Sequence, residues 1–184
     1  MRIHDERISA YAASLPAPEP FASAAALTTL ERARVTAFWL TLDAINFGSG
    51  WFPTLRKRRE PTGYRTIVAG VRRQFDEHGP WSASELCALT AAELAAVFDQ
   101  EPEHELMALF AASLRDLGTH LLVDCHGVFT ATADAARGSA VALVGTLAGW
   151  ECFADVSRYG GWRLAFLKRA QIAAADLHRA GVAR

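Results

Sequence analysis

Apolar residues recur at intervals of three and four along most of this 184-residue chain, and this spacing restricts what the chain can fold into. In the clearest run, five large apolar residues fall on one face of a helix: Leu106, Phe110, Leu114, Leu117 and Leu121. We find no convincing alternation with the period of two that half-buried strands require, although residues 121–123 fit a short strand as well as a helix end. The pattern predicts an all-α protein with a single domain over residues 1–184.

Cap signals set the expected helix boundaries. A Ser or Thr followed three residues later by Glu forms a capping box, and this pattern occurs at 28–31, 82–85 and 90–93. The predicted helices cover about 28–45, 64–78, two short stretches after 82 and 90, a long stretch that begins at Pro102, 139–148 and 162–180. The last of them is expected to bury Phe166, Ala170, Ala173 and Leu177. Three prolines make 15–20 an extended entry segment.

The composition excludes several classes of protein. The net charge is −1 and 21% of the residues are charged, so the chain as a whole is not biased toward nucleic acid, membranes or acidic partners. Three scattered cysteines do not form a disulfide framework, and the first residues carry no apolar signal segment. These features predict a cytoplasmic protein, and they disfavour a membrane or a nucleic acid as partner.

The stretch from Asp43 to Phe52 is the first candidate for a binding site. An acid, an amide and three aromatic residues meet there, where a helix gives way to a glycine-rich loop. Asn46 could hydrogen-bond to the edge of a base, and Phe47, Trp51 or Phe52 could stack on its face. In the alternative interpretation, Asn46 ends the helix and the aromatic residues fill the core.

Other polar clusters give weaker signals. The basic run 56–59 could bind phosphate, but such runs are commonly solvated loops. The spacing of His120, Cys125 and His126 fits no standard zinc pattern, and His104 is at most a weak ligand or base candidate because the chain has no His-Glu-x-x-His. We therefore predict no metal and no organic cofactor.

The last predicted helix carries cations next to a run of alanines. Lys168, Gln171 and Arg179 lie near one flank, and Arg169 and Asp176 are seven residues apart and so nearly aligned. A pair of cations in this position could hold a phosphate. The alternative is a solvated face of an amphipathic helix.

Three stretches in this order resemble the queuosine salvage family. They are Leu-Asp-Ala-Ile-Asn-Phe at 42–47, Thr-Gly-Tyr at 62–64, and Phe-Leu-Lys-Arg-Ala-Gln-Ile at 166–172 with Ala-Asp at 175–176. The resemblance covers about residues 38–176. It implies a helical fold related to the helix-hairpin-helix DNA glycosylases. It also implies hydrolysis of the N-glycosidic bond of queuosine 5′-monophosphate, which gives queuine and ribose 5-phosphate.

The resemblance also implies roles for particular residues. Lys168 matches a lysine that belongs to the active site in this family, so it is the expected catalytic residue. The expected substrate-binding residues are Asp43, Asn46, Phe47, Tyr64 and Arg169, with the first three at the base.

One feature of the family has no counterpart in this sequence. Members of the family continue beyond the Lys-Arg-Ala-Gln helix into a Phe-Ala-Asp segment, and its aspartate is the expected catalytic carboxylate. The same three residues occur here at 153–155, but they precede Lys168, so the role is not transferred to them. A truncated gene product, a fragment, or a member that binds without catalysing would each explain this difference. In each case apolar helix faces should be left uncovered.

Two other functions compete with the glycosylase. One is a non-catalytic module that binds a nucleotide or a deazapurine. The other is a helical DNA-binding or scaffold protein that uses residues 56–59, whose affinity for DNA would depend strongly on salt.

Overall fold

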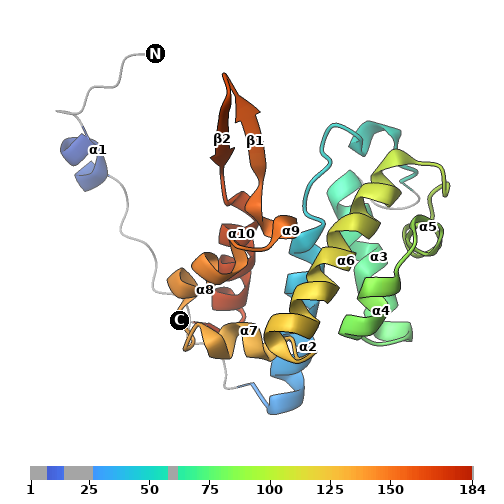
Figure 1. The fold of residues 1–184 in the computed structure, drawn as a ribbon, viewed down its shortest axis with the longest axis horizontal. Coiled ribbons are helices and arrows are strands. Elements are labelled where there is room, and N and C mark those ends of the chain that lie inside the picture. Colours follow the sequence, from blue (N-terminus) through green and yellow to red (C-terminus); the bar gives the residue numbers. More distant parts are fainter. Residues whose placement is uncertain (1–7, 15–26, 58–61, 184) are drawn as a thin grey trace.

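The computed structural model describes residues 8–14, 27–57 and 62–183 (Figure 1). Its elements in chain order are α1 (Ile8–Ser14), α2 (Thr29–Ala44), the short 3-10 helix η2 (Phe52–Thr54), α3 (Gly63–Glu77), α4 (Ala83–Ala88), α5 (Ala91–Phe98), α6 (Glu105–Cys125), α7 (Thr130–Ala135), α8 (Ala140–Leu147), α9 (Glu151–Ala154), β1 (Val156–Tyr159), β2 (Trp162–Ala165) and α10 (Lys168–Arg179). The all-α prediction is confirmed, apart from one small two-stranded sheet. The predicted extended segment at 15–20 lies outside the described residues.

Local cap signals predicted the starts of three helices correctly. In α2, α4 and α5 the N-cap Ser or Thr accepts the backbone N–H of the Glu three residues later, and that Glu accepts the N-cap N–H in return. Each box satisfies two N–H groups that have no partner inside the helix. These helix starts are therefore fixed by residues that are neighbours in the sequence.

The start of α6 differs from the prediction. The helix begins at Glu105 and not at Pro102, because the His104 ring accepts the Leu106 N–H at 3.2 Å and so caps the first turn. The His104 backbone N–H closes a turn onto the Glu101 carbonyl at 3.0 Å, and Pro102 lies inside this turn. His104 therefore has a structural role. The predicted apolar stripe of α6 is confirmed, since all five of its residues are fully buried.

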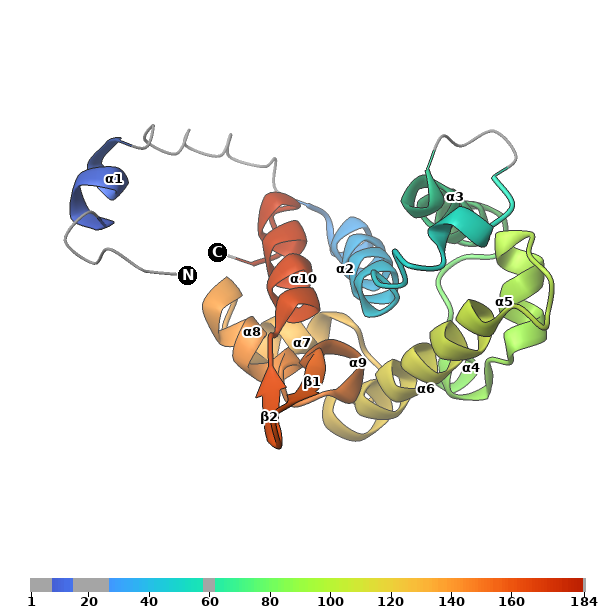
Figure 2. The same cartoon turned by 90° about the horizontal axis from the view of Figure 1, so that it is seen from above.

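Helix α6 is also long and apolar enough to cross a membrane by length and composition alone. Half of its most apolar window is buried inside the protein, because α4 and α5 pack against it together with α2 and α9. In Figure 2 the helix runs from the side of α7 and α9 toward α4 and α5. Its apolar stripe therefore forms part of the core.

Helix α2 lies between two sets of helices and packs against both. It contacts α3 and α6 on one side and α7 and α10 on the other, while α10 also packs on α8 and α9 (Figure 2). At its end, the Ala44 carbonyl accepts the Ser113 hydroxyl of α6 at 2.6 Å and Nη1 of Arg169 of α10 at 2.7 Å. The C-terminal end of α2 is thus the point where α6 and α10 are joined.

The close packing of α6 against α4 depends on Gly118. A Cβ atom at this position would lie 2.7 Å from the Ala83 carbonyl oxygen and 2.8 Å from the Cys87 backbone nitrogen. We expect Gly118→Ala to lower the free energy of unfolding by about 1–3 kcal/mol, because backbone atoms must move apart. Urea unfolding measures this change.

Gly145→Ala on α8 is the matched control, since no atom lies within 4 Å of the added methyl group. There alanine should add up to about 1 kcal/mol through helix propensity. Equal effects of the two substitutions would contradict the prediction.

The sequence predicted a helix over 162–180, and this prediction is wrong for the first third of that range. Residues 156–165 form an antiparallel hairpin, in which Tyr159 pairs with Trp162 across a Gly160-Gly161 turn. Both glycines have positive φ, at 53° and 84°, as a tight two-residue hairpin turn requires. Leu167 also has positive φ, at 55°, which places the start of α10 at Lys168. Ala170, Ala173 and Leu177 are buried as predicted, whereas Phe166 is 61% exposed.

The remaining differences are small. Helices α1, α7 and α9 were not predicted, the predicted helix at 139–148 is α8, and residues 121–123 are helical. Among the described residues ten large apolar side chains are exposed, and four of them lie on or beside the hairpin: Tyr159, Trp162, Leu164 and Phe166.

Candidate functional site

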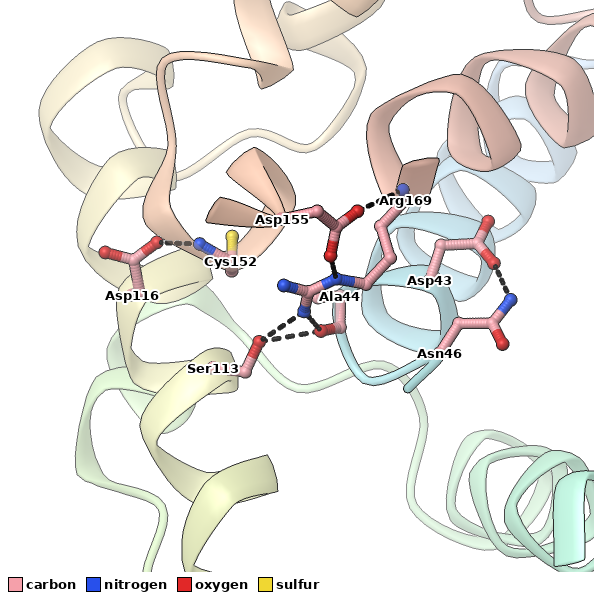
Figure 3. A network of polar contacts seen from close by, with 8 residues as sticks. All are labelled: Asp43, Ala44, Asn46, Ser113, Asp116, Cys152, Asp155 and Arg169. Atoms are coloured by element: carbon pink, nitrogen blue, oxygen red, sulfur yellow. Dashed lines mark hydrogen bonds and ion pairs between the residues drawn. The ribbon is translucent and has the colours of Figure 1, made fainter. Parts of the chain in front are cut away.

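The site begins where α2 ends. The helix stops at Ala44, and the chain then turns back on itself, with the Asn46 N–H bonded to the Asp43 carbonyl at 3.2 Å and the Phe47 N–H bonded to the Ile45 carbonyl at 2.8 Å. This turn places Asp43 and Asn46 side by side, and Nδ2 of Asn46 donates to Oδ1 of Asp43 at 3.2 Å (Figure 3). The predicted acid and amide are therefore a hydrogen-bonded pair.

Arg169 joins this corner to the start of α10. Its Nε donates to Oδ1 of Asp155 at 2.6 Å, and its Nη1 donates to the Ala44 carbonyl (Figure 3). Its guanidinium carbon lies 4.8 Å from the centre of the Phe47 ring, which is a cation–π contact. The Arg169 side chain is only 12% exposed. The two predicted residues Phe47 and Arg169 are thus in direct contact.

Asp155 caps α10 from outside the helix. Its Oδ2 accepts the backbone N–H of Arg169 at 2.6 Å, in the first turn of a helix whose own N-cap, Leu167, has no capping side chain. Asp116 does the same for α9, where its Oδ2 accepts the Cys152 N–H at 2.8 Å. Both carboxylates satisfy N–H groups at helix starts, where the helix dipole also favours negative charge.

Phe47 and Arg169 line a small cavity. Its volume is about 270 Å³, and its other lining residues are Ala112, Ser113, Asp116, Glu151 and Cys152. One edge of the half-buried Phe47 ring packs against Phe110, with ring centres 5.2 Å apart. An aromatic face and a guanidinium at a cavity of this size are suited to contact part of a planar ligand.

Asp43 is a buried carboxyl with an unsatisfied atom. The residue is fully buried, and its Oδ2 has no hydrogen-bond partner among the described residues. Burial, with the nearby charge of Asp176 as a second cause, raises the pKa of Asp43 to about 7. Asp176 itself accepts a hydrogen bond from Arg179 at 2.5 Å. The end of α2 therefore holds a carboxyl group that is poised to exchange a proton near neutral pH.

This shift makes the stability of the protein depend on pH. The folded protein keeps a proton on Asp43 between about pH 4 and pH 7, whereas the unfolded chain releases it, so the free energy of unfolding falls as the pH rises through this range. We expect Asp43→Asn to be more stable than the native chain at pH 8, by a few kcal/mol (~1.4 kcal/mol per pKa unit). At pH 4 this gain should vanish. Thermal unfolding of both proteins at the two pH values measures it, with the exposed Asp76→Asn as control. A gain of equal size at both pH values would contradict the prediction.

Tyr64 faces a different cavity. This groove of about 700 Å³ lies between α2 and α3, and its lining includes Trp39, Leu42, Tyr64, Arg65 and Arg72. Burial, followed by the charges of Asp43 and Asp176, raises the pKa of the Tyr64 hydroxyl, so Tyr64 is electrostatically coupled to the acids at the end of α2. Tyr64 is 39% exposed, and Leu42 on the groove floor directly precedes Asp43 in the chain.

Lys168 lies at the edge of this arrangement. It is the first residue of α10, it is exposed, and it directly precedes Arg169. It is not among the residues that line the two cavities. Its assignment as the catalytic residue stays a prediction.

The five predicted substrate-binding residues therefore fall into three groups. Asp43 and Asn46 form a buried pair, Phe47 and Arg169 line one cavity, and Tyr64 lines another. Sequence reasoning missed Asp155 and Ser113, which bind Arg169, and no local spacing pattern points to either. Arg169 and Asp176, seven residues apart on α10, form ion pairs with Asp155 and Arg179 respectively.

The other polar candidates are in structural contacts. Arg56 forms an ion pair with Glu101, while Arg58 and Arg59 lie outside the described residues. His120 stacks on Trp150 at 4.9 Å and contacts Asp124 at 2.8 Å. Within the described ranges, no group of three or more His, Cys, Asp or Glu side chains could hold a metal ion.

The fold and this site define a helical protein whose polar centre lies where one helix unwinds against the start of another. Residues 27–183 match the sequence model of the queuosine salvage protein family. The chain is also 34% identical, over 154 residues, to a queuosine 5′-phosphate N-glycosylase/hydrolase from Sphaerobacter thermophilus. That alignment covers 81% of this chain. The chain belongs to the queuosine salvage protein family.

The relative is considerably longer. The alignment covers 48% of it, so the chain spans about half the length of the curated relative that it matches.

Proposed function

We propose that this chain takes part in queuosine salvage by hydrolysing the N-glycosidic bond of queuosine 5′-monophosphate, which releases queuine and ribose 5-phosphate. The proposal is supported by the family and by the activity for which the Sphaerobacter relative is named. The observation that carries it is the contact between the end of α2 and the start of α10, where Arg169 lies over Phe47 beside a cavity.

The chemistry of this bond requires a charged site. Breaking an N-glycosidic bond builds positive charge on the sugar, as in other glycoside hydrolyses. The leaving base is a 7-deazaguanine, which has carbon in place of N7 and so lacks a common protonation point. More of the barrier must then be lowered by stabilising the sugar cation and orienting water, for which a carboxylate is suited.

The described residues can be given roles in this reaction. Lys168 would hold the substrate through its phosphate or polarise the site as the catalytic cation. Phe47 would stack on the base beside Arg169. Asp43 and Asn46 would accept and donate hydrogen bonds at the base edge, and Tyr64 would contact the substrate from the α3 side.

A second candidate function is binding without hydrolysis. The observation in its favour is that two aspartates of this region, Asp116 on the cavity wall and Asp155 beside Arg169, already accept N–H groups at helix starts. In this case the chain would bind the nucleotide or a related deazapurine but would not turn it over.

One assay separates the two functions. The protein is incubated with queuosine 5′-monophosphate, and free queuine is measured by chromatography and mass spectrometry, with guanosine 5′-monophosphate as control substrate. Release of queuine that increases with protein concentration supports hydrolysis. Calorimetric binding without release supports the binding module. The absence of both binding and release contradicts the proposal.

Phe47 offers a test of how the base is held. We expect Phe47→Ala to weaken the binding of queuine by about 1–3 kcal/mol, because the stacking surface is lost. The binding of ribose 5-phosphate should change much less. Competition of each compound against the nucleotide measures the two effects. Equal loss for both compounds would place Phe47 outside the base site.

A further inference from the structure

The β1–β2 hairpin projects from the helical body with little cover. All residues from 157 to 166 are exposed, and the two strands extend away from the neighbouring helices (Figure 1). A two-stranded hairpin on its own is marginally stable in water. Its side chains are therefore available to a partner.

The two faces of the hairpin have different chemistry. Cross-strand partners share a face, so Tyr159 and Trp162 lie together on one face, 79% and 74% exposed, with the pair Ser157 and Leu164 behind them. The opposite face carries Arg158 directly across from Arg163. One face thus offers aromatic surface, and the other offers a pair of cations.

The arginine pair lacks compensating charge. Like charges directly across a strand pair are destabilising. Neither arginine forms an ion pair with any residue that the structure describes, and the sequence contains no Asp or Glu from 156 to 175. The nearest acid, Asp155, is bound by Arg169. An anionic partner would remove this repulsion.

We propose that the hairpin binds single-stranded nucleic acid. Exposed aromatic side chains provide stacking surfaces for unpaired bases, and nearby arginines bind the phosphates. The sequence disfavoured nucleic acid because the net charge is −1 and the run at 56–59 is short. Those arguments average over the whole chain, whereas the hairpin gathers cations and aromatic rings locally.

The arrangement fits a flexible strand better than it fits a membrane or a second copy of this chain. A membrane surface would meet the aromatic face only and would leave Arg158 and Arg163 directed away from its headgroups. Two copies paired through their aromatic faces would leave the arginines repelling each other as before. A single strand can place its bases on one face and carry its phosphates around the edge to the other.

The test is the binding of a fluorescein-labelled oligouridylate to the full chain, measured by anisotropy at several salt concentrations. We expect Trp162→Leu to weaken binding on the order of tenfold, because leucine keeps the apolar cross-strand contact but removes the stacking surface. Replacing both Arg158 and Arg163 with glutamine should reduce the slope of log affinity against log salt by about 1.4. These glutamines also remove a repulsion within the hairpin, so any loss of affinity is not due to unfolding.

The matched control replaces two exposed cations elsewhere, Lys57→Gln with Arg137→Gln, and gives the same change in net charge. We expect it to bind as the native chain does. The proposal is overturned if the native chain does not bind at low salt, if the control loses as much affinity as the hairpin variants, or if duplex DNA binds as tightly as the single strand. It is also overturned if the aromatic face instead drives binding to anionic vesicles or dimerisation, as seen by co-sedimentation or light scattering.

Discussion

Replacing Arg169 with alanine is expected to lower the free energy of unfolding by about 3 kcal/mol or more. The substitution leaves Asp155, whose side chain is 20% exposed, without its ion-pair partner. It also removes the hydrogen bond to the Ala44 carbonyl and the contact with the Phe47 ring. Because Arg169 joins α10 to the end of α2, the loss should reduce the cooperativity between these helices. Urea unfolding followed by circular dichroism measures it.

Arg169→Lys is the informative comparison. Lysine keeps the positive charge, but it cannot bind Asp155 and Ala44 at the same time in the planar geometry of a guanidinium. We expect it to recover less than half of the lost stability. Exposed ion pairs typically contribute less than about 1 kcal/mol to stability. A change as small as this for Arg169→Ala would show that the contacts of Arg169 are unimportant for the fold.

The substitution Lys168→Ala, one residue earlier, is expected to leave stability almost unchanged and to lower turnover or nucleotide affinity. Lys168 is exposed at the first position of α10, so its removal should change the free energy of unfolding by less than about 0.5 kcal/mol. If the chain is active, turnover of queuosine 5′-monophosphate should fall by about a hundredfold or more, because a charge in contact with the reacting substrate is lost. If the chain only binds, affinity for the nucleotide should fall instead. Queuine release and calorimetry measure the two cases.

Lys168→Arg is the matched control, since it preserves the charge and should retain part of the effect on the phosphate. The assignment of Lys168 would be wrong if Lys168→Ala unfolded the chain while the affinity of each folded molecule stayed unchanged.

The sequence predicted elements whose determinants are local. The starts of α2, α4 and α5 follow from a hydroxyl and a carboxylate three residues apart, and the core face of α6 follows from helical spacing. The sequence prediction lacks the hairpin because helical spacing extends backward from Ala170 only as far as Trp162, whereas the Gly160-Gly161 pair just before it favours a tight turn between two strands.

The tertiary contacts of the site could not be predicted in this way. Arg169 finds its carboxylate fourteen residues earlier, across the hairpin, and its carbonyl partner lies at Ala44 in another helix. The capping of α9 by Asp116 is equally non-local. These contacts depend on how the helices pack, and spacing along the chain carries no information about packing.

The family resemblance identified site residues that helical spacing alone does not identify. It selected Phe47 and Arg169 together, and the structure brings them into contact. It also selected Asp43, whose burial and raised pKa no sequence pattern indicated. The division between the Phe47 cavity and the Tyr64 groove depends on three-dimensional packing alone.

We propose that the corner between α2 and α10 receives the nucleotide. Titration of ¹⁵N-labelled protein with queuosine 5′-monophosphate, followed by amide chemical shifts, tests this most directly. We expect saturable shifts centred on Asn46, Phe47, Lys168 and Arg169, and we expect Lys168→Ala to weaken them. Shifts confined to other surfaces, or no shifts at millimolar nucleotide, would contradict it.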